Sequence, residues 1–124
     1  NDLSQYTLAA DRMQGVLAPL LSPWQPALLQ MVKLACEGGR ATGKPIGVCG
    51  EAGGDPLLAL VLTGLGVSSL SMAAGKVNAV RAALRLHDLA TCQQMAAYAV
   101  DATTATAAKA AVVRLAPPTL LDLL

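Results

Sequence analysis

Apolar residues recur at helical spacing in the segment that follows Ser22. The four positions are Leu28, Met31, Val32 and Ala35. Their i, i+3, i+4, i+7 spacing predicts an amphipathic helix with these side chains on its buried face. Ser22 can cap the first amides, and Pro23 suits the first helical position because no backbone N–H is needed there. Since Gly38-Gly39 favours a left-handed stop, we predict a helix from about Pro23 to about Gly38.

A second apolar segment begins at Asp55-Pro56, a pair typical of a helix cap and a first helical residue. This segment is apolar nearly all round up to Gly64, so the helix should pack on more than one side. Shorter apolar runs at residues 44–49 and 67–72 have the character of strands, and residues 3–10 form a mildly strand-like run.

The last third of the chain has the pattern of successive helices. Residues 76–86 place apolar side chains on one face, which predicts a helix there. Asp88 can cap a further helix that ends near Ala102, and Thr103 or Thr104 can cap another that ends near Leu115. Pro117-Pro118 is expected to end the regular structure.

Strands and helices alternate in this prediction, which indicates an α/β fold with βα units and a parallel sheet buried on both faces. A closed (β/α)8 TIM barrel takes about 250 residues, so a chain of 124 residues is expected to hold about three of its βα units. We predict that residues 1–86 form these units and that residues 87–124 form a C-terminal helical extension. Open sheet edges would leave such a unit in need of a partner.

Composition narrows the classes of function. Hydrophobic residues make up 54% of the chain, aromatic residues 2%, and the net charge is +1, so neither stacking on bases nor attraction to a nucleic acid is expected. No apolar stretch reaches the roughly 20 residues of a spanning helix, which predicts no membrane insertion. Three cysteines without CxxC spacing argue against a disulfide framework and favour a reducing cytoplasm. The chain has neither an initiator Met nor a signal peptide at its start, so we expect a piece of a longer protein.

Reactive side chains stand where the predicted strands end. In βα architectures, catalytic groups sit at the carboxyl ends of strands. Asn1-Asp2 and Cys49-Gly50-Glu51 are the segments of this kind. The glycine-rich residues 50–54 lack the ending of a phosphate-binding P-loop, and a single His excludes an HExxH zinc site.

Two segments resemble the phosphoenolpyruvate-utilising enzymes. Residues 1–12 are similar to the NDLxQYTLAxDR motif of that family, and residues 47–56 are similar to its GxCGExxGDP motif. Leu65-Gly66 and Leu70-Ser71-Met72 continue the likeness. These residues resemble one branch of the family in particular, the Enzyme I type of the phosphoenolpyruvate:sugar phosphotransferase system. The resemblance runs to about Leu86, and it implies the C-terminal portion of a (β/α)8 barrel with its last three βα units.

The resemblance also implies a reaction and roles for individual residues. Enzymes of this family move the phosphoryl group of phosphoenolpyruvate (PEP) to a His on a separate N-terminal domain, and the enolate that remains is protonated to pyruvate. By this likeness Asp2 would ligate Mg²⁺, Asn1 would hydrogen-bond the substrate, Arg12 would hold the phosphoryl group, and Cys49 would deliver the proton. The implied partners are PEP and pyruvate, a histidine-containing phosphocarrier protein, and a second copy of the chain in a homodimer. This chain alone is expected to be inactive.

Other interpretations remain open. The chain could be a non-catalytic module that dimerises or binds another protein, or a relative of pyruvate phosphate dikinase or PEP synthase. Cys36 and Cys92 are expected only to pack inside helices. His87, between two predicted helices, is expected either to have a structural role at a helix end or to face solvent. Glu51 is expected to order the glycine-rich loop.

Overall fold

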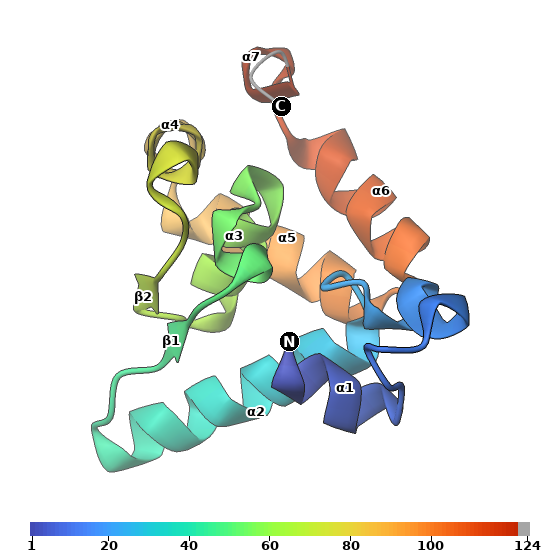
Figure 1. The fold of residues 1–124 in the computed structure, drawn as a ribbon. Coiled ribbons are helices and arrows are strands. Elements are labelled where there is room, and N and C mark those ends of the chain that lie inside the picture. Colours follow the sequence, from blue (N-terminus) through green and yellow to red (C-terminus); the bar gives the residue numbers. More distant parts are fainter. Residues whose placement is uncertain (122–124) are drawn as a thin grey trace.

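The computed structural model describes residues 1–121 as a mostly helical α/β structure with one short parallel sheet at its side (Figure 1). Three of the described segments are short 3-10 helices, labelled η. The elements are α1 (Asp2–Leu8), η1 (Gly15–Leu21), α2 (Pro26–Thr42), β1 (Gly47–Val48), η2 (Glu51–Gly54), α3 (Pro56–Leu65), β2 (Ser69–Leu70), η3 (Ala74–Lys76), α4 (Val77–Arg85), α5 (Leu89–Asp101), α6 (Ala105–Leu115) and α7 (Pro118–Leu121).

The sheet consists of β1 and β2, which pair in parallel through Gly47 with Ser69 and Val48 with Leu70. Hydrogen bonds from Ser68 N to Ile46 O and from Ser71 N to Val48 O, each 2.9 Å, extend the pairing at both ends. The two strands and α3 between them form one βαβ unit. The strands predicted at residues 44–49 and 67–72 are therefore present but shorter, and the described residues do not confirm the predicted three units of a barrel.

The N-terminal segment corrects the strand prediction for residues 3–10, because α1 is a helix there. Ser4 is its buried residue, with Thr7 and Leu8 partly buried, which is the i, i+3, i+4 spacing of a helix face. That face packs on α2. The strand preference of Tyr6-Thr7 is overridden because residues 2–8 can bury one face against α2 only when they form a helix. Ala9, in the left-handed region with φ 49°, ends the helix.

Helix α2 differs from its prediction at both ends and in its buried face. Pro26, not Pro23, is its first residue, and it runs through Gly38 and Gly39 to a left-handed cap at Gly43. A side chain at Gly39 would put its Cβ 2.7 Å from Lys44 O, so this glycine allows the chain to return closely after the helix. The buried positions are Leu28, Leu29, Val32, Cys36 and Gly39. The predicted core residues Met31 and Ala35 are instead exposed.

Helix α3 is the centre of the core, as its uniformly apolar sequence predicted. Asp55 caps it as predicted, with Oδ1 accepting from Leu57 N at 3.0 Å and from Leu58 N at 3.2 Å. The helix packs against α2, α4, α5 and α6. Gly64 lies against the backbone of Cys92 in α5 so closely that no side chain fits between the two helices.

The C-terminal helices begin at the predicted caps. Asp88 caps α5 by accepting from Thr91 N at 2.7 Å, and Thr104, rather than Thr103, caps α6. Pro118 begins the short α7, so regular structure continues beyond the point where the prolines were expected to end it. One apolar core includes residues from both sides of the predicted boundary at residue 86, and that boundary stays a prediction. Within residues 1–121, no helix has both the length and the apolar character that a membrane crossing requires.

Candidate functional site

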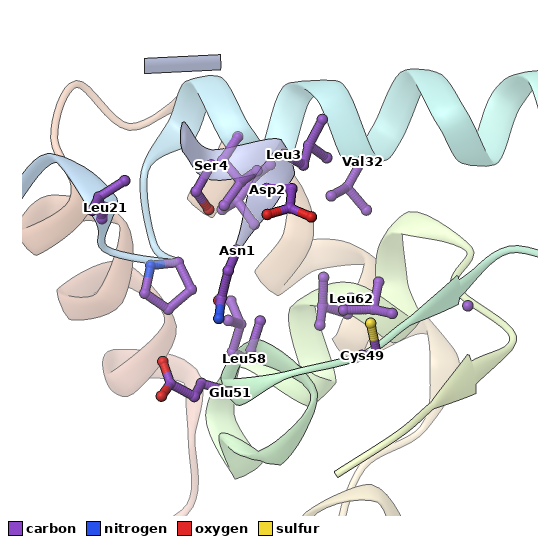
Figure 2. A pocket seen from close by; sticks show the side chains of 16 residues that line it. Asn1, Asp2, Leu3, Ser4, Leu21, Val32, Cys49, Glu51, Leu58 and Leu62 are labelled. Atoms are coloured by element: carbon purple, nitrogen blue, oxygen red, sulfur yellow. The ribbon is translucent and has the colours of Figure 1, made fainter. Parts of the chain in front are cut away.

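A pocket of about 300 Å³ lies between α1, the start of α2, and the segment that joins β1 to α3 (Figure 2). Figure 2 shows Asn1 and Asp2 on the α1 side, and Glu51 and Cys49 on the side of β1 and η2. The lining residues are Asn1, Asp2, Leu3, Ser4, Leu21, Pro23, Leu28, Leu29, Val32, Gly47, Val48, Cys49, Glu51, Ala52, Leu58 and Leu62. The pocket thus combines a few polar groups with a mostly apolar lining.

Asn1 and Asp2 reach the pocket because they form the N-terminal end of α1. Asp2 lies in the first turn, where a carboxylate interacts favourably with the helix dipole. The side chain of Asn1 extends toward the loop after β1, since its Oδ1 lies 3.8 Å from the Cβ position at Gly50. The structure therefore brings together the two segments that sequence reasoning selected as strand ends, although the first is a helix start.

Cys49 follows β1 directly and is an exposed free thiol on the pocket wall. The next residue, Gly50, has φ 78° and ψ −159°, a conformation that glycine adopts without strain. This geometry turns the chain sharply into η2 and leaves the thiol beside the pocket. The described residues thus offer a nucleophilic or proton-donating group on a short loop.

The other two cysteines are buried in helices, as predicted. Cys36 lies in α2 and Cys92 in α5. Burial raises the pKa of both thiols above the ordinary value of 9.0, so both stay neutral and act as small apolar side chains. Cys49 is therefore the accessible cysteine.

Arg12 lies near the site but does not line the pocket. Its Nη1 donates to Asp2 Oδ1 at 3.1 Å, and the two side chains are 54% and 78% exposed. An ion pair with this exposure contributes about 0–1 kcal/mol to stability. The guanidinium therefore stands at the outer rim of the pocket, held loosely by Asp2.

Several residues that line the pocket were not predicted from the sequence. Glu51 lines the pocket, although its sequence position suggested only a role in ordering the loop. Ser4 also lines it, and it lies one helical turn after Asn1. Had residues 2–8 been predicted as a helix, the i, i+3 spacing would have placed Ser4 on the face of Asn1. Leu21 and Pro23 come from a turn that the sequence pattern did not connect with the site.

The oxygen donors at the pocket fit a divalent cation only in part. Asp2 and Glu51 provide carboxylates and Asn1 a carboxamide, which are hard ligands. Among the described residues, however, no group of three or more His, Cys, Asp or Glu could hold a metal ion. Mg²⁺ is usually bound through one or two carboxylates together with water and substrate phosphates. The donor set therefore suits an ion that a substrate helps to bind.

His87 lies away from the pocket, between α4 and α5, as the sequence predicted. Its Nδ1 is 2.8 Å from Ala83 O, the carbonyl one turn earlier in α4. Because a carbonyl oxygen only accepts, Nδ1 carries the hydrogen of this bond. The ring thus completes the C-terminal turn of α4 and takes no part in the pocket.

Comparisons with known proteins relate these residues to one family. The family described as PEP-utilising enzyme, PEP-binding domain, matches residues 1–89. The chain is 56% identical over 111 residues to a phosphoenolpyruvate-protein phosphotransferase of Streptomyces coelicolor. The aligned residues cover 90% of this chain and 20% of that relative. A multiphosphoryl transfer protein of Xanthomonas campestris is 43% identical over 105 residues, with 85% of this chain and 12% of the relative covered. A phosphoenolpyruvate-protein phosphotransferase of Listeria monocytogenes is 36% identical over 105 residues, with 85% and 18% covered. The chain spans a fifth or less of the length of these relatives.

Proposed function

The chain belongs to the PEP-utilising enzymes, whose PEP-binding domain it matches over residues 1–89, and from this premise we propose that it forms part of the PEP site of a phosphoenolpyruvate-protein phosphotransferase. The observation that carries the proposal is the convergence of Asn1, Asp2 and Cys49 on one pocket from segments far apart in the sequence. The most similar relatives described above carry the names of enzymes that transfer phosphoryl groups. The proposed partners are therefore PEP, pyruvate and a histidine-containing phosphocarrier protein.

Cys49 is the proposed proton donor. Once the phosphoryl group has left PEP for a histidine elsewhere in the enzyme, the three-carbon enolate needs a proton at its methylene carbon. The Cys49 thiol would give that proton, forming the methyl group of pyruvate, and the thiolate would regain a proton from water. Its place on an exposed loop beside the pocket allows both exchanges.

Asn1, Asp2 and Glu51 are proposed to bind and orient the negatively charged phosphate and carboxylate groups of the substrate. The carboxylate of Asp2, with Glu51 across the same pocket, would hold Mg²⁺ together with phosphate and water. Bound Mg²⁺ would neutralise the charge that develops as the phosphoryl group leaves. The Asn1 carboxamide, which both donates and accepts hydrogen bonds, would fix the carboxylate or the enol oxygen of the substrate.

Arg12 is proposed to bind the phosphoryl group. Its guanidinium forms a planar fork that matches phosphate oxygens. The exposed pair with Asp2 is weak, so Arg12 can leave it when a phosphate group competes. Arg12 would therefore have to turn from the rim toward the pocket on substrate binding.

The βαβ unit is proposed to belong to a (β/α)8 barrel. Within residues 1–121, the sheet contains only β1 and β2, so each strand has one edge without a partner strand. Unpaired strand edges present backbone N–H and C=O groups that bind a further strand readily. The pocket also lies at the carboxyl end of β1, where barrel enzymes place their active sites.

A chimeric enzyme tests this proposal. The matching segment of the Streptomyces coelicolor relative is replaced by this chain, and PEP-dependent phosphorylation of the carrier and formation of pyruvate are measured. We expect an active chimera, and a Cys49→Ala variant that forms pyruvate about 10² to 10⁴ times more slowly, the usual contribution of a general acid. Cys36→Ala, which alters a buried cysteine, is the matched control and should keep the rate. Unchanged turnover in Cys49→Ala removes this residue from the proposed role.

A second candidate function is self-association, because large apolar side chains are exposed near the N-terminus. Tyr6, Met13 and Val16 are 80%, 85% and 86% exposed. Exposed apolar surface of this kind is typical of an interface between protein chains. Sedimentation velocity should detect a dimer, and the double variant Met13→Ser/Val16→Ser should be monomeric. A monomer at all concentrations rejects this candidate and leaves the catalytic proposal intact.

A further inference from the structure

Trp24, the single tryptophan of the chain, makes a polar contact that the proposed chemistry does not use. The residue is 4% exposed, and its indole Nε1 donates to Asp55 Oδ2 at 3.1 Å. The other oxygen of the same carboxylate accepts from the backbone N–H groups of Leu57 and Leu58. Both oxygens of Asp55 are thus used, one for the helix cap and one for the tryptophan.

This hydrogen bond connects two walls of the pocket. Trp24 directly follows Pro23, which lines the pocket from the η1–α2 side. Asp55 ends the loop that begins at Cys49 and lines the opposite side. Among the hydrogen bonds of the described residues, it is the one that joins residues 1–43 to residues 46–121. The other contacts between these two parts of the chain are apolar, and apolar contacts have little directional preference.

The loop that carries Cys49 is fixed at its two ends. At the first end, Ser71 N donates to Val48 O at 2.9 Å and holds the end of β1 beside β2. At the second end, Asp55 is held by the amides of α3 and by Trp24. The position of the thiol relative to the α1 side of the pocket therefore depends on the second anchor, because within residues 1–121 it provides the hydrogen bond that reaches across the pocket.

We propose that Trp24 is a positioning residue, whose indole N–H acts through Asp55 to hold the Cys49 loop at a fixed distance from the opposite wall of the pocket. As far as proton delivery is concerned, this inference rests on the proposed function. The positioning itself does not depend on it. A hydrogen bond to a partly buried carboxylate is of the stronger kind, and its loss should raise local opening of the loop about tenfold.

Two single variants test the contact in different ways. Trp24→Phe keeps an aromatic ring and removes the N–H donor. Asp55→Asn keeps a good helix cap, but its carboxamide has one oxygen and cannot accept from both Trp24 and the α3 amides. We expect amide hydrogen exchange at Leu57 and Leu58 to rise about tenfold in each variant. The double variant should be no worse than either single variant, because both remove the same contact.

Thiol alkylation reports on the loop itself. Cys49 is exposed while Cys36 and Cys92 are buried, so the three sites can be followed separately by mass spectrometry. We expect alkylation of Cys49 to become several-fold faster in both variants, with the buried cysteines unchanged. Asp88→Ala is the control, since it removes a helix cap of the same kind, that of α5, at a residue that lines neither the pocket beside Cys49 nor the surface hollow beside Trp24.

The outcomes separate this inference from the proposed function. Unchanged exchange and alkylation in Trp24→Phe, or equal changes in Asp88→Ala, overturn the positioning role. In the chimeric enzyme, Trp24→Phe should lower kcat for pyruvate formation more than it changes KM for PEP. A chimera in which Cys49→Ala has no effect, but in which Trp24→Phe still frees the loop, rejects the proton donor and keeps the positioning residue.

Discussion

Gly53 provides a direct test of how the backbone shapes the candidate site. It is buried in η2, between Cys49 and the cap of α3. A Cβ on Gly53 would lie 2.6 Å from Ser71 O and 3.4 Å from Val48 O. Both are backbone oxygens at the ends of the paired strands, so no change of rotamer can relieve the clash. Gly53→Ala must therefore move the loop away from the sheet or separate the strands.

The size of the effect follows from the nature of the obstacle. Overpacking of this kind typically lowers the free energy of unfolding by about 1–3 kcal/mol. Gly38→Ala is the matched control, because Gly38 lies inside α2 with nothing within 4 Å of its Cβ position. That substitution should raise the free energy of unfolding by about 0.5–1 kcal/mol through helix propensity. For a chain of this length, each kcal/mol corresponds to a shift in Tm of about 4 °C.

Urea denaturation and thermal unfolding of the two variants measure these changes. We expect opposite signs, with Gly53→Ala less stable and Gly38→Ala more stable than the parent chain, at the same m-value. In the chimeric enzyme, Gly53→Ala should also lower the rate of pyruvate formation, while Gly38→Ala should not. A Gly53→Ala variant as stable as the parent would show that the loop does not approach the sheet as closely as the distance between the Gly53 Cβ position and Ser71 O indicates.

Gly64→Ala should destabilise the chain by about 2 kcal/mol or more, because the new methyl group meets the α5 backbone at Cys92; equilibrium denaturation measures it. The hydrogen bond from Thr91 N holds the pKa of Asp88 below its ordinary value of 3.8. The ionised Asp88 therefore stabilises the fold above pH 3.8, and this stabilisation is lost as pH falls through the pKa of the folded state. Asp88→Asn should reduce this acid dependence of the denaturation midpoint. Burial raises the pKa of Cys36 and Cys92 above 9.0. The neutral thiols therefore stabilise the fold fully below pH 9.0, and this stabilisation is lost as pH rises through the pKa values of the folded state. Replacing both with Ala should flatten the alkaline decline in the free energy of unfolding.

Local signals in the sequence predicted the helices that begin at a capped position. Asp55, Asp88 and Thr104 each accept a backbone hydrogen bond at the start of a helix, and this chemistry depends on neighbouring residues alone. The start of α2 was wrong because Ser22 caps only a turn: its Oγ accepts from Trp24 N at 3.3 Å, and the helix begins later. A cap residue therefore indicates a helix start only when the residues after it also pack.

Features that depend on distant partners were harder to predict. The strand predicted at residues 3–10 became a helix because α2 offers an apolar surface to one of its faces. The glycines expected to end α2 lie inside it, since Gly39 is needed where the chain returns past the helix. The pocket itself was predicted in part: Asn1, Asp2 and Cys49 meet there, but Ser4 and Pro23 reach it through contacts that no local pattern encodes.

The two roles of Asp55 connect local structure with the candidate chemistry. Its Oδ1 forms the cap of α3, the most buried helix of the core, and its Oδ2 binds the indole that borders the opposite wall of the pocket. A carboxylate can do both because its two oxygens accept independently, whereas the single hydroxyl oxygen of serine or threonine cannot lie beside the α3 amides and the indole at the same time. The glycines before Asp55 let the loop approach the sheet, and Asp55 ends that loop at a fixed point. The same short segment thus starts the central helix and sets the place of Cys49, so the stability of the core and the geometry of the pocket cannot vary independently there.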